Sequence, residues 1–317
     1  MWKQKNLLGI KELSKEELLD ILELGLEMKK HIFRQSNQKE SLPYGNMTTL
    51  FFENSTRTKH SFTVAGQNVG LLVSDLGLST SSVKKGESLY DTAITIDQMG
   101  MDVVVIRHGS SGAAHFLAKN CNASIINAGD GTNEHPTQAL LDCLTILELK
   151  GDFEGLNVCI AGDIVHSRVA RSNIYALTKL GAKVTLTGPS TLLPKGMSSL
   201  GATVNYDVKE AIKDADVVIG LRIQLERQKS GAFPDLREYH NIFGIDEEVM
   251  SYAKKDAILM HPGPVNRNVE ISSNIAEAPY STISEQVTNG VAVRMAILTR
   301  IMETRINSIN KELRRII

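Results

Sequence analysis

Short, nearly continuous apolar runs alternate along this chain with longer amphipathic stretches, in which apolar and polar positions are mixed. Ser14 and Glu17 form a capping box before the first amphipathic stretch, and helix-like segments separate most of the apolar runs. This alternation predicts an α/β protein in which parallel sheets are flanked by helices. The runs typical of buried strands are 47–52, 103–106, 124–126, 158–161, 184–186, 217–220 and 258–260.

The length of the chain predicts two domains. With 317 residues and 42% hydrophobic content, it is long enough to bury a large core. The segment Lys150-Gly151-Asp152-Phe153-Glu154-Gly155 is the best candidate for a boundary near the middle. An amphipathic run from about Ser284 to the end predicts one long final helix.

Charge and cysteine content exclude several classes of function. A net charge of −1 disfavours binding to nucleic acid or to a membrane surface, since both depend on concentrated basic charge. No apolar segment is long enough to span a bilayer, so we expect a cytoplasmic protein. Cys121, Cys143 and Cys159 lack metal-site spacing, and we interpret them as buried, reduced thiols. We expect neither a metal nor a cofactor.

Polar clusters occur at two junctions between a strand-like run and a helix-like run. The first contains the hydroxyls of Ser55, Thr56 and Thr58 together with Arg57, all of which suit an anion at a helix start. Ordinary helix capping explains this cluster equally well when it is taken alone. The second cluster runs from Gly129 to Gln138.

Further candidates also follow strand-like runs. Because open α/β sheets bind ligands beyond the carboxyl ends of their strands, polar residues at those ends indicate a site. Any single one has a plain structural explanation as a surface arginine or a core histidine. Four such junctions together favour a functional site at Arg107 and His108, at His135, at Arg168, and at Arg222 with Gln224.

The two clusters carry a family resemblance. Ser55-Thr56-Arg57-Thr58 followed by His135-Pro136-Thr137-Gln138 resembles the paired signature of the aspartate and ornithine carbamoyltransferases, and the resemblance extends over essentially the whole chain. It implies two α/β domains joined by long interdomain helices. Residues 1–150, completed by the final helix at about 285–317, would bind carbamoyl phosphate, and residues 151–284 would bind aspartate.

The resemblance also assigns roles around carbamoyl phosphate. Arg57, Thr58, Arg107 and His135 would be catalytic: Ser55, Thr56, Arg57 and Thr58 cradle the phosphate, while Thr58, Arg107 and His135 polarise the carbonyl. We expect His135 to act as a neutral donor. Gln138 and the backbone at Gly263 and Pro264 would accept hydrogen bonds from the amide. The resemblance implies a cis bond before Pro264. The plain structural alternative for His261-Pro262-Gly263-Pro264 is an ordinary tight loop.

The acceptor pocket separates the two branches of the family. L-aspartate has two carboxylates, and the resemblance places Arg168, Arg222, Gln224 and Lys85 around them. The Ser-Met-Gly and His-Cys-Leu-Pro segments typical of ornithine enzymes are not found in this sequence. Closer matching therefore favours the aspartate branch, with a role in making UMP. Arg171 and Arg227 are better explained as structural ion-pair partners.

The resemblance also implies an oligomer. The loop containing Ser81 and Lys85 would reach into the active site of a neighbouring subunit, most simply in a homotrimer, whereas Lys84 would face solvent. The stretch 228–240 resembles a mobile loop that closes over the substrates.

Other classes of function remain as alternatives. They are a carbamoyltransferase for another amine such as ornithine, and a non-catalytic two-lobed anion-binding protein. A nicotinamide-binding fold is disfavoured because the sequence has no G-x-G-x-x-G motif, and it has no P-loop motif either.

Overall fold

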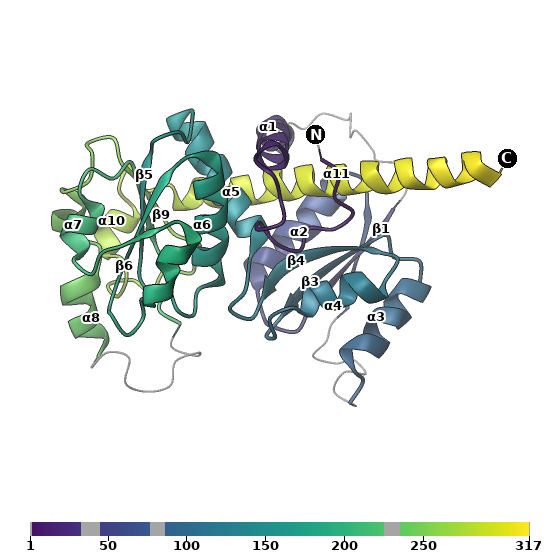
Figure 1. Ribbon diagram of the computed structural model, residues 1–317, viewed down its shortest axis with the longest axis horizontal. Helices are drawn as coiled ribbons and strands as arrows, with labels where there is room; N and C mark the ends of the chain where they lie inside the picture. Colours follow the sequence, from purple (N-terminus) through teal and green to yellow (C-terminus); the bar gives the residue numbers. More distant parts are fainter. Residues whose placement is uncertain (1, 33–44, 77–85, 225–234, 317) are drawn as a thin grey trace. The chain divides into compact units, whose positions relative to one another are not determined.

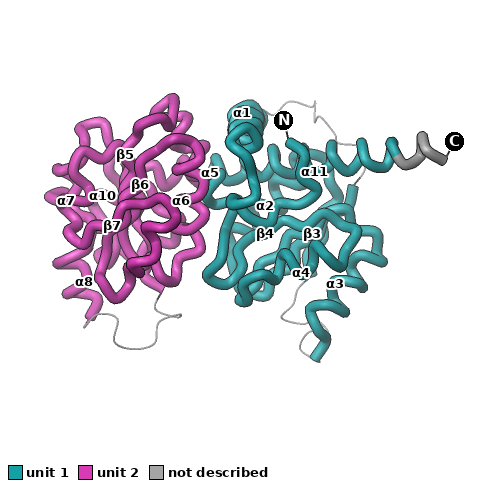
Figure 2. The backbone as a smooth tube through the Cα atoms, in the orientation of Figure 1, with its two compact units in different colours: residues 1–140, 288–317 teal, residues 141–287 magenta. Residues whose placement is uncertain are grey.

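The computed structural model describes residues 2–32, 45–76, 86–224 and 235–316. The chain forms two compact units, one of residues 1–140 and 288–317 and the other of residues 141–287 (Figure 2). Two helices pass from one unit into the other, α5 (Pro136–Lys150) and α11 (Ile283–Ile316). Within each unit, helices lie against a parallel sheet (Figure 1), as the alternation of apolar runs predicts.

Unit 1 contains a four-stranded parallel sheet in the order β2-β1-β3-β4. The strands β1, β3 and β4 carry nearly continuous buried residues, because helices cover both of their faces. The elements of this unit, besides α5 and α11, are α1 (Lys15–Ile32), β1 (Asn46–Phe51), α2 (Thr56–Asn68), β2 (Leu72–Asp75), α3 (Leu89–Gln98), β3 (Val103–His108), α4 (Ala113–Asn120) and β4 (Ser124–Asp130).

Unit 2 contains a five-stranded parallel sheet in the order β7-β6-β5-β8-β9. One of its cores packs Cys159 and Val218 of the sheet against Ile212 and Val249. The elements of this unit are β5 (Asn157–Ala161), α6 (Arg168–Leu180), β6 (Lys183–Thr187), η2 (Lys195–Leu200), β7 (Thr203–Val204), α7 (Val208–Ile212), β8 (Val217–Gly220), α8 (Leu236–Phe243), α9 (Glu247–Met250), β9 (Ile258–Met260) and α10 (Ser273–Ala276).

The seven strands predicted from apolar runs are all present. β8 and β9 have the predicted bounds, and the other five are shifted or extended by a few residues at their ends. The prediction missed β2 and β7. Most of β2 is exposed and half of its residues are polar, and β7 has only two residues, so neither produces an apolar run. Both lie at the edge of their sheet, where one side of the strand has no neighbouring strand to bury it.

The predicted capping box at the start of α1 is confirmed. The backbone N–H of Glu17 donates to the Ser14 hydroxyl at 3.2 Å, and the backbone N–H of Ser14 donates to the Glu17 carboxylate at 3.0 Å. The predicted final helix is also confirmed, since α11 begins at Ile283. None of the helices in the described ranges is both long and apolar enough to cross a membrane.

The three cysteines are buried free thiols. Burial raises the pKa of Cys121 and Cys143, and it raises that of Cys159 from 9.0 to about 12. A thiolate is the reactive form, so we expect native protein at pH 8 to react with a thiol reagent roughly a hundredfold more slowly than unfolded protein. Comparing the two labelling rates checks this; equal rates would contradict the buried, neutral state.

The same shift has a consequence for stability. Between pH 9.0 and about 12 the unfolded chain loses the Cys159 proton while the folded chain keeps it. The unfolded state then binds fewer protons, so the free energy of unfolding falls as pH rises through this window and is unaffected by Cys159 below it.

Candidate active site

The carboxyl ends of three strands of unit 1 lie side by side at one edge of its sheet, the carboxyl edge. The neighbouring strands β1, β3 and β4 are parallel, and Phe51 pairs with Arg107 in their register. The backbone N–H of Phe52 donates to the Arg107 carbonyl at 2.8 Å, and that of Gly131 donates to the His108 carbonyl at 2.9 Å. The ends of these strands and the segments that follow them contain the predicted phosphate and carbonyl residues, and they therefore lie side by side.

The start of α2 does not follow the capping explanation. Ser55 is its N-cap residue, yet its hydroxyl makes no capping hydrogen bond, whereas Ser88 and Ser167 cap α3 and α6 with theirs. Thr56 and Arg57 are exposed in the first turn, and Thr58 is buried. A helix start with exposed donors and an uncommitted N-cap hydroxyl suits an anion better than it suits local capping.

The helix starts at the predicted sites also lack acidic residues. The first turns of α2, α5 and α6 contain none, and those of α4 and α10 contain none either, while those of α1, α3, α7, α8, α9 and α11 contain Asp or Glu. Acidic residues at that position stabilise a helix by offsetting its positive end. Arg57 and Arg168 instead add positive charge there, an arrangement that favours a bound anion over helix stability.

Arg107 is held by contacts within this edge. Its Nε lies 3.5 Å from a Glu53 carboxylate oxygen, and its Nη1 donates to the Ala128 carbonyl at 3.4 Å. The guanidinium is thus tied to the segments after β1 and within β4. Glu53 was not among the residues predicted for the site, although it lies only two residues before Ser55.

The loop before His135 is fixed by two buried carboxylates that the sequence analysis did not single out. Asp130 accepts from the Gly112 N–H at 2.7 Å and from the Glu134 N–H at 3.2 Å. Glu134 accepts from the Ile10 N–H at 2.7 Å, which ties the loop to the N-terminal segment. His135 is only 5% exposed, and Gln138 is also buried. One feature of the sequence could have identified Asp130 and Glu134: they are acidic residues in a loop of otherwise small or polar residues.

His108 has a structural role in this edge. Its Nδ1 accepts from the Ser110 N–H at 2.9 Å. Its ring packs edge-on against the Phe52 ring, with 4.7 Å between the two ring centroids. Desolvation by burial lowers its pKa, although the charges of Glu53 and Asp130 oppose that shift. These contacts explain the position of His108: its neutral imidazole accepts a backbone hydrogen bond at Nδ1 and packs against Phe52. We therefore assign it no direct role in the chemistry.

Unit 2 brings the predicted carboxylate-binding residues to its own sheet edge. Arg168 is the first residue of α6 and is buried, while Arg222 and Gln224 follow β8, the neighbour of β5. The buried Asp163 joins the two segments, because it accepts from the Gln224 N–H at 3.3 Å and contacts His166 Nδ1 at 2.9 Å.

A glycine permits this close approach. At Gly162 the backbone φ is +131°, and a Cβ there would lie 2.7 Å from the Leu221 carbonyl oxygen. Any side chain would push the segment after β5 away from the segment after β8. The Gly162-Asp163 pair therefore sets the spacing between the parts of the chain that carry Arg168 and Arg222.

The turn after β9 has the cis bond that the resemblance implies, between Gly263 and Pro264. His261 Nδ1 accepts from the Gly263 N–H at 2.8 Å, and its Nε2 lies 3.3 Å from a carboxylate oxygen of Glu270. The His261 N–H donates to Gln286 at 2.9 Å. These contacts hold the turn from both sides.

Several predicted residues lie outside the described ranges: Ser81, Lys84, Lys85 and Arg227. The expectation of a loop over 228–240 is wrong for its last part, since residues 236–240 belong to α8. Asp235 accepts from the Glu238 N–H at 2.8 Å and caps this helix, so a local signal favours a helix where the resemblance implies a loop.

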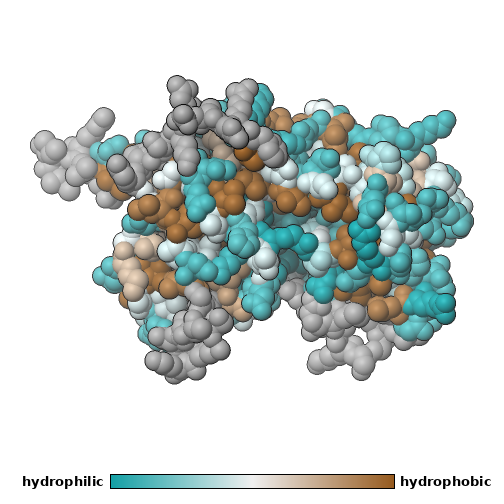
Figure 3. Space-filling view, turned by 180° about the vertical axis from the view of Figure 1, so that it is seen from behind, coloured by the Kyte–Doolittle hydropathy of each residue, from teal (hydrophilic) through white to brown (hydrophobic). Residues whose placement is uncertain are grey.

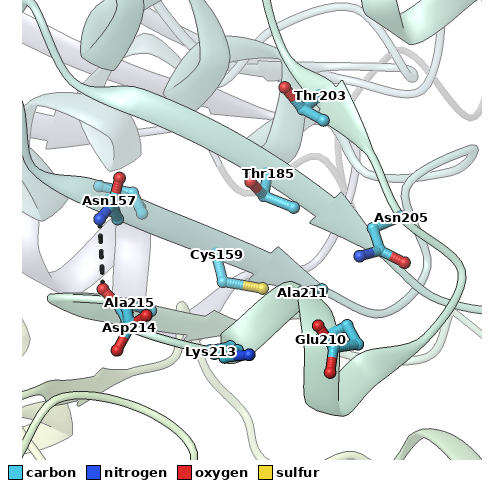
Figure 4. Close-up of a pocket in the computed structure, with 11 residues that line it drawn as sticks. Asn157, Cys159, Thr185, Thr203, Asn205, Glu210, Ala211, Lys213, Asp214 and Ala215 are labelled. Carbon is cyan, nitrogen blue, oxygen red and sulfur yellow. Dashed lines mark hydrogen bonds between the residues drawn. The ribbon is translucent and has the colours of Figure 1, made fainter.

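One cavity of about 310 Å³ lies over the sheet of unit 2, beside α7 (Figure 4). Its lining includes Asn157, Cys159 and Thr185, and contains none of the predicted site residues that the structure describes. Within the described ranges, no group of three or more His, Cys, Asp or Glu side chains is placed to hold a metal ion.

Two family models match almost the entire chain. The carbamoyl-P binding domain of aspartate/ornithine carbamoyltransferase matches residues 5–148, and the Asp/Orn binding domain matches residues 154–301. The chain is 59% identical over 302 residues to an aspartate carbamoyltransferase catalytic subunit of Caldanaerobacter subterraneus, covering 95% of this chain and 99% of that relative.

Solved structures agree with these matches. Aspartate transcarbamoylase from Trypanosoma cruzi, in complex with carbamoyl aspartate and phosphate, is 30% identical with a TM-score of 0.83, covering 93% of this chain and 95% of that one. Ornithine carbamoyltransferase from Pyrococcus furiosus is 28% identical with the same TM-score, covering 94% of this chain and 97% of that one. The fold alone thus leaves the acceptor open between aspartate and ornithine.

Proposed function

The chain belongs to the aspartate/ornithine carbamoyltransferase family, and we infer that it transfers the carbamoyl group of carbamoyl phosphate to the amine of L-aspartate. The products are N-carbamoyl-L-aspartate and phosphate, and the reaction is an early step of pyrimidine biosynthesis. The observation that carries this inference is the 59% identity, over nearly the whole of both chains, to an aspartate carbamoyltransferase catalytic subunit.

We propose that the edge of unit 1 binds carbamoyl phosphate. The hydroxyls of Ser55, Thr56 and Thr58 and the guanidinium of Arg57 would hold the phosphate at the start of α2. The positive charge of Arg57 in the first turn of α2, with no acidic residue in that turn, supports this role. The dianion then meets helix N–H groups, hydroxyls and positive charge together.

The carbonyl of the substrate needs donors where negative charge develops. We assign this role to Thr58, Arg107 and His135, the last as a neutral imidazole. Gln138 and the backbone carbonyls at Gly263 and Pro264 would accept from the amide. The Glu53 and Ala128 contacts of Arg107, and the Asp130 and Glu134 network beside His135, support a preorganised arrangement.

The reaction then needs no covalent enzyme intermediate. The lone pair of the neutral aspartate amine attacks the carbonyl carbon and forms the C–N bond. The tetrahedral intermediate collapses as the C–O bond to phosphate breaks, and the leaving phosphate takes that electron pair and accepts the amine proton. Most of the rate enhancement would come from orientation and fixed positive charge.

For aspartate, we propose that Arg168 and Arg222 bind the two carboxylates, with help from Gln224 and Lys85. Guanidinium forks match carboxylates geometrically, whereas the cationic side chain of ornithine would be repelled. The Asp163 contact that joins the two segments supports their acting as one pocket.

We further propose a cytoplasmic homotrimer in which Ser81 and Lys85 complete the active site of the neighbouring subunit. The edge strand β2 leads directly into the segment 77–85, and Leu72 on this strand is 67% exposed. An edge strand with an exposed leucine suits a subunit contact. On the face shown in Figure 3, apolar residues lie in groups among hydrophilic ones. Buried cysteines without disulfides agree with a reducing compartment.

Steady-state assays with carbamoyl phosphate and either L-aspartate or L-ornithine test the proposed function. We expect carbamoyl aspartate and phosphate to appear in equal amounts, with activity toward ornithine lower by at least about a thousandfold, because a charge mismatch at both guanidinium groups opposes it. Turnover with ornithine alone would overturn the aspartate assignment. Binding of carbamoyl phosphate without turnover of either amine would favour a binding protein.

A further inference from the structure

Arg294 is a deeply buried arginine of α11 that has no role in the proposed mechanism. It is 4% exposed, and its guanidinium reaches two other helices. Its Nη1 donates to the Ser61 hydroxyl of α2 at 2.9 Å, and its Nη2 donates to the Thr137 hydroxyl of α5 at 3.4 Å. The guanidinium carbon also lies 5.0 Å from the centre of the Phe62 ring. These residues all belong to unit 1.

The two helices that Arg294 contacts do not follow adjacent strands. α2 follows β1 and α5 follows β4, and β3 lies between these strands in the sheet. Strands are about 4.8 Å apart, so the two helix starts stand roughly 10 Å apart at the level of the sheet. A phosphate and carbonyl group held by both helices requires this separation to be constant to a fraction of an ångström.

The contacts of Arg294 are close in sequence to the residues proposed to touch the substrate. Ser61 lies three residues after Thr58, one turn further along the same face of α2. Thr137 lies in the first turn of α5, between His135 and Gln138. A shift at either contact is therefore transmitted to substrate-binding groups through less than two turns of rigid helix.

We propose that Arg294 is a positioning residue for carbamoyl phosphate binding, which braces the starts of α2 and α5 against each other through Ser61 and Thr137. Because the fork is planar and its two Nη atoms point to different helices, it sets a fixed distance between them. Its buried positive charge lies behind both helix starts and adds to their attraction for a dianion. This inference rests on the proposed function of unit 1.

The same helix offers a matched control. Arg300 is also on α11, and its guanidinium pairs with Asp20 of α1 at 2.8 Å and with Glu303 at 3.0 Å. Arg300→Met removes an arginine and its polar contacts from α11 without touching α2 or α5 through any contact described above. Because the Arg300 side chain is 26% exposed and Arg294 is 4% exposed, thermal unfolding of both variants is measured to separate loss of stability from loss of phosphate binding.

The experiment measures two quantities for each full-length variant: the KM for carbamoyl phosphate at saturating aspartate, and the affinity for inorganic phosphate by titration calorimetry. We expect Arg294→Met and Arg294→Lys to raise the KM and weaken phosphate binding by at least about tenfold, since each loses hydrogen bonds from a charged fork. Thr137→Val should show a smaller change in the same direction, and Thr137→Ser should stay within about twofold of the original protein.

Equal values for Arg294→Met and Arg300→Met in both measurements would overturn the inference. If Arg294→Met fails to fold, Thr137→Val decides, because it keeps the shape of the side chain and removes only the hydroxyl; unchanged phosphate affinity in that variant would also overturn it. An unmodified protein that binds phosphate but transfers no carbamoyl group would contradict the proposed function instead, while the phosphate titrations would still decide the role of Arg294.

Discussion

Replacing Arg57 by alanine is expected to reduce kcat/KM for carbamoyl transfer by about a thousandfold or more while leaving the fold intact. The guanidinium is the charged group in the first turn of α2 and would act on the phosphate as it accumulates charge on departure. Loss of one preorganised donor in such a position typically costs a factor of 100 to 1,000 in rate, roughly, and loss of a full charge should reach the upper end. Steady-state kinetics at saturating aspartate would measure it.

The position of Arg57 makes this result easy to interpret. Its side chain is exposed, and exposed substitutions usually change the free energy of unfolding by less than about 0.5 kcal/mol. Thermal unfolding of the variant should therefore match that of the original protein. Lys59 is a suitable control because it lies on the same helix and pairs with Asp75, so Lys59→Ala removes a cation without removing a proposed phosphate contact. Near-normal activity in Arg57→Ala would show that the phosphate assignment is wrong.

Replacing Arg222 by alanine is expected to raise the KM for aspartate by at least about a hundredfold, with little change in the affinity for carbamoyl phosphate. A guanidinium that donates two hydrogen bonds to a carboxylate contributes about 1.5–3 kcal/mol per bond, and every 1.4 kcal/mol is a factor of ten. Arg222→Lys should recover only part of the loss, since an ammonium group lacks the fork. Initial rates over a range of aspartate concentrations, and separately over a range of carbamoyl phosphate concentrations, would give the KM for each substrate.

Arg267→Ala is the control for this second prediction. Its side chain is 53% exposed and pairs with Glu277, so its loss should leave the KM for aspartate within about twofold of normal. An equal rise in the KM for aspartate and in that for carbamoyl phosphate in Arg222→Ala would contradict a specific role in aspartate binding and indicate a general disturbance of unit 2.

The sequence predicted best those features that depend on short-range periodicity. The capping box at Ser14, the start of α11 at Ile283 and the seven apolar strands all follow from side chains within a few residues of one another. The same locality explains the errors. β2 and β7 lack an apolar run because only one side of each pairs with another strand, and α8 begins with a capping aspartate inside a segment that the family resemblance describes as a loop.

For the candidate site, too, the sequence predicted some features and not others. That polar residues gather at the carboxyl ends of strands was readable from the order of runs and motifs, because parallel strands place all those ends at one edge. The sequence did not reveal which partners fix them: the pairing of Arg107 with Glu53, the contact of Glu134 with Ile10, or the Asp163 carboxylate that joins the segments after β5 and β8.

The sequence by itself therefore determined the fold class, the family and the residue types available for chemistry, because these depend on local patterns and on motifs that keep their order. Only the tertiary structure decided that the Ser55 hydroxyl does not cap α2 and that Arg294 joins Ser61 to Thr137 across 233 and 157 positions of sequence. Such contacts depend on strand order and on burial, and neither is encoded in any short window of the chain.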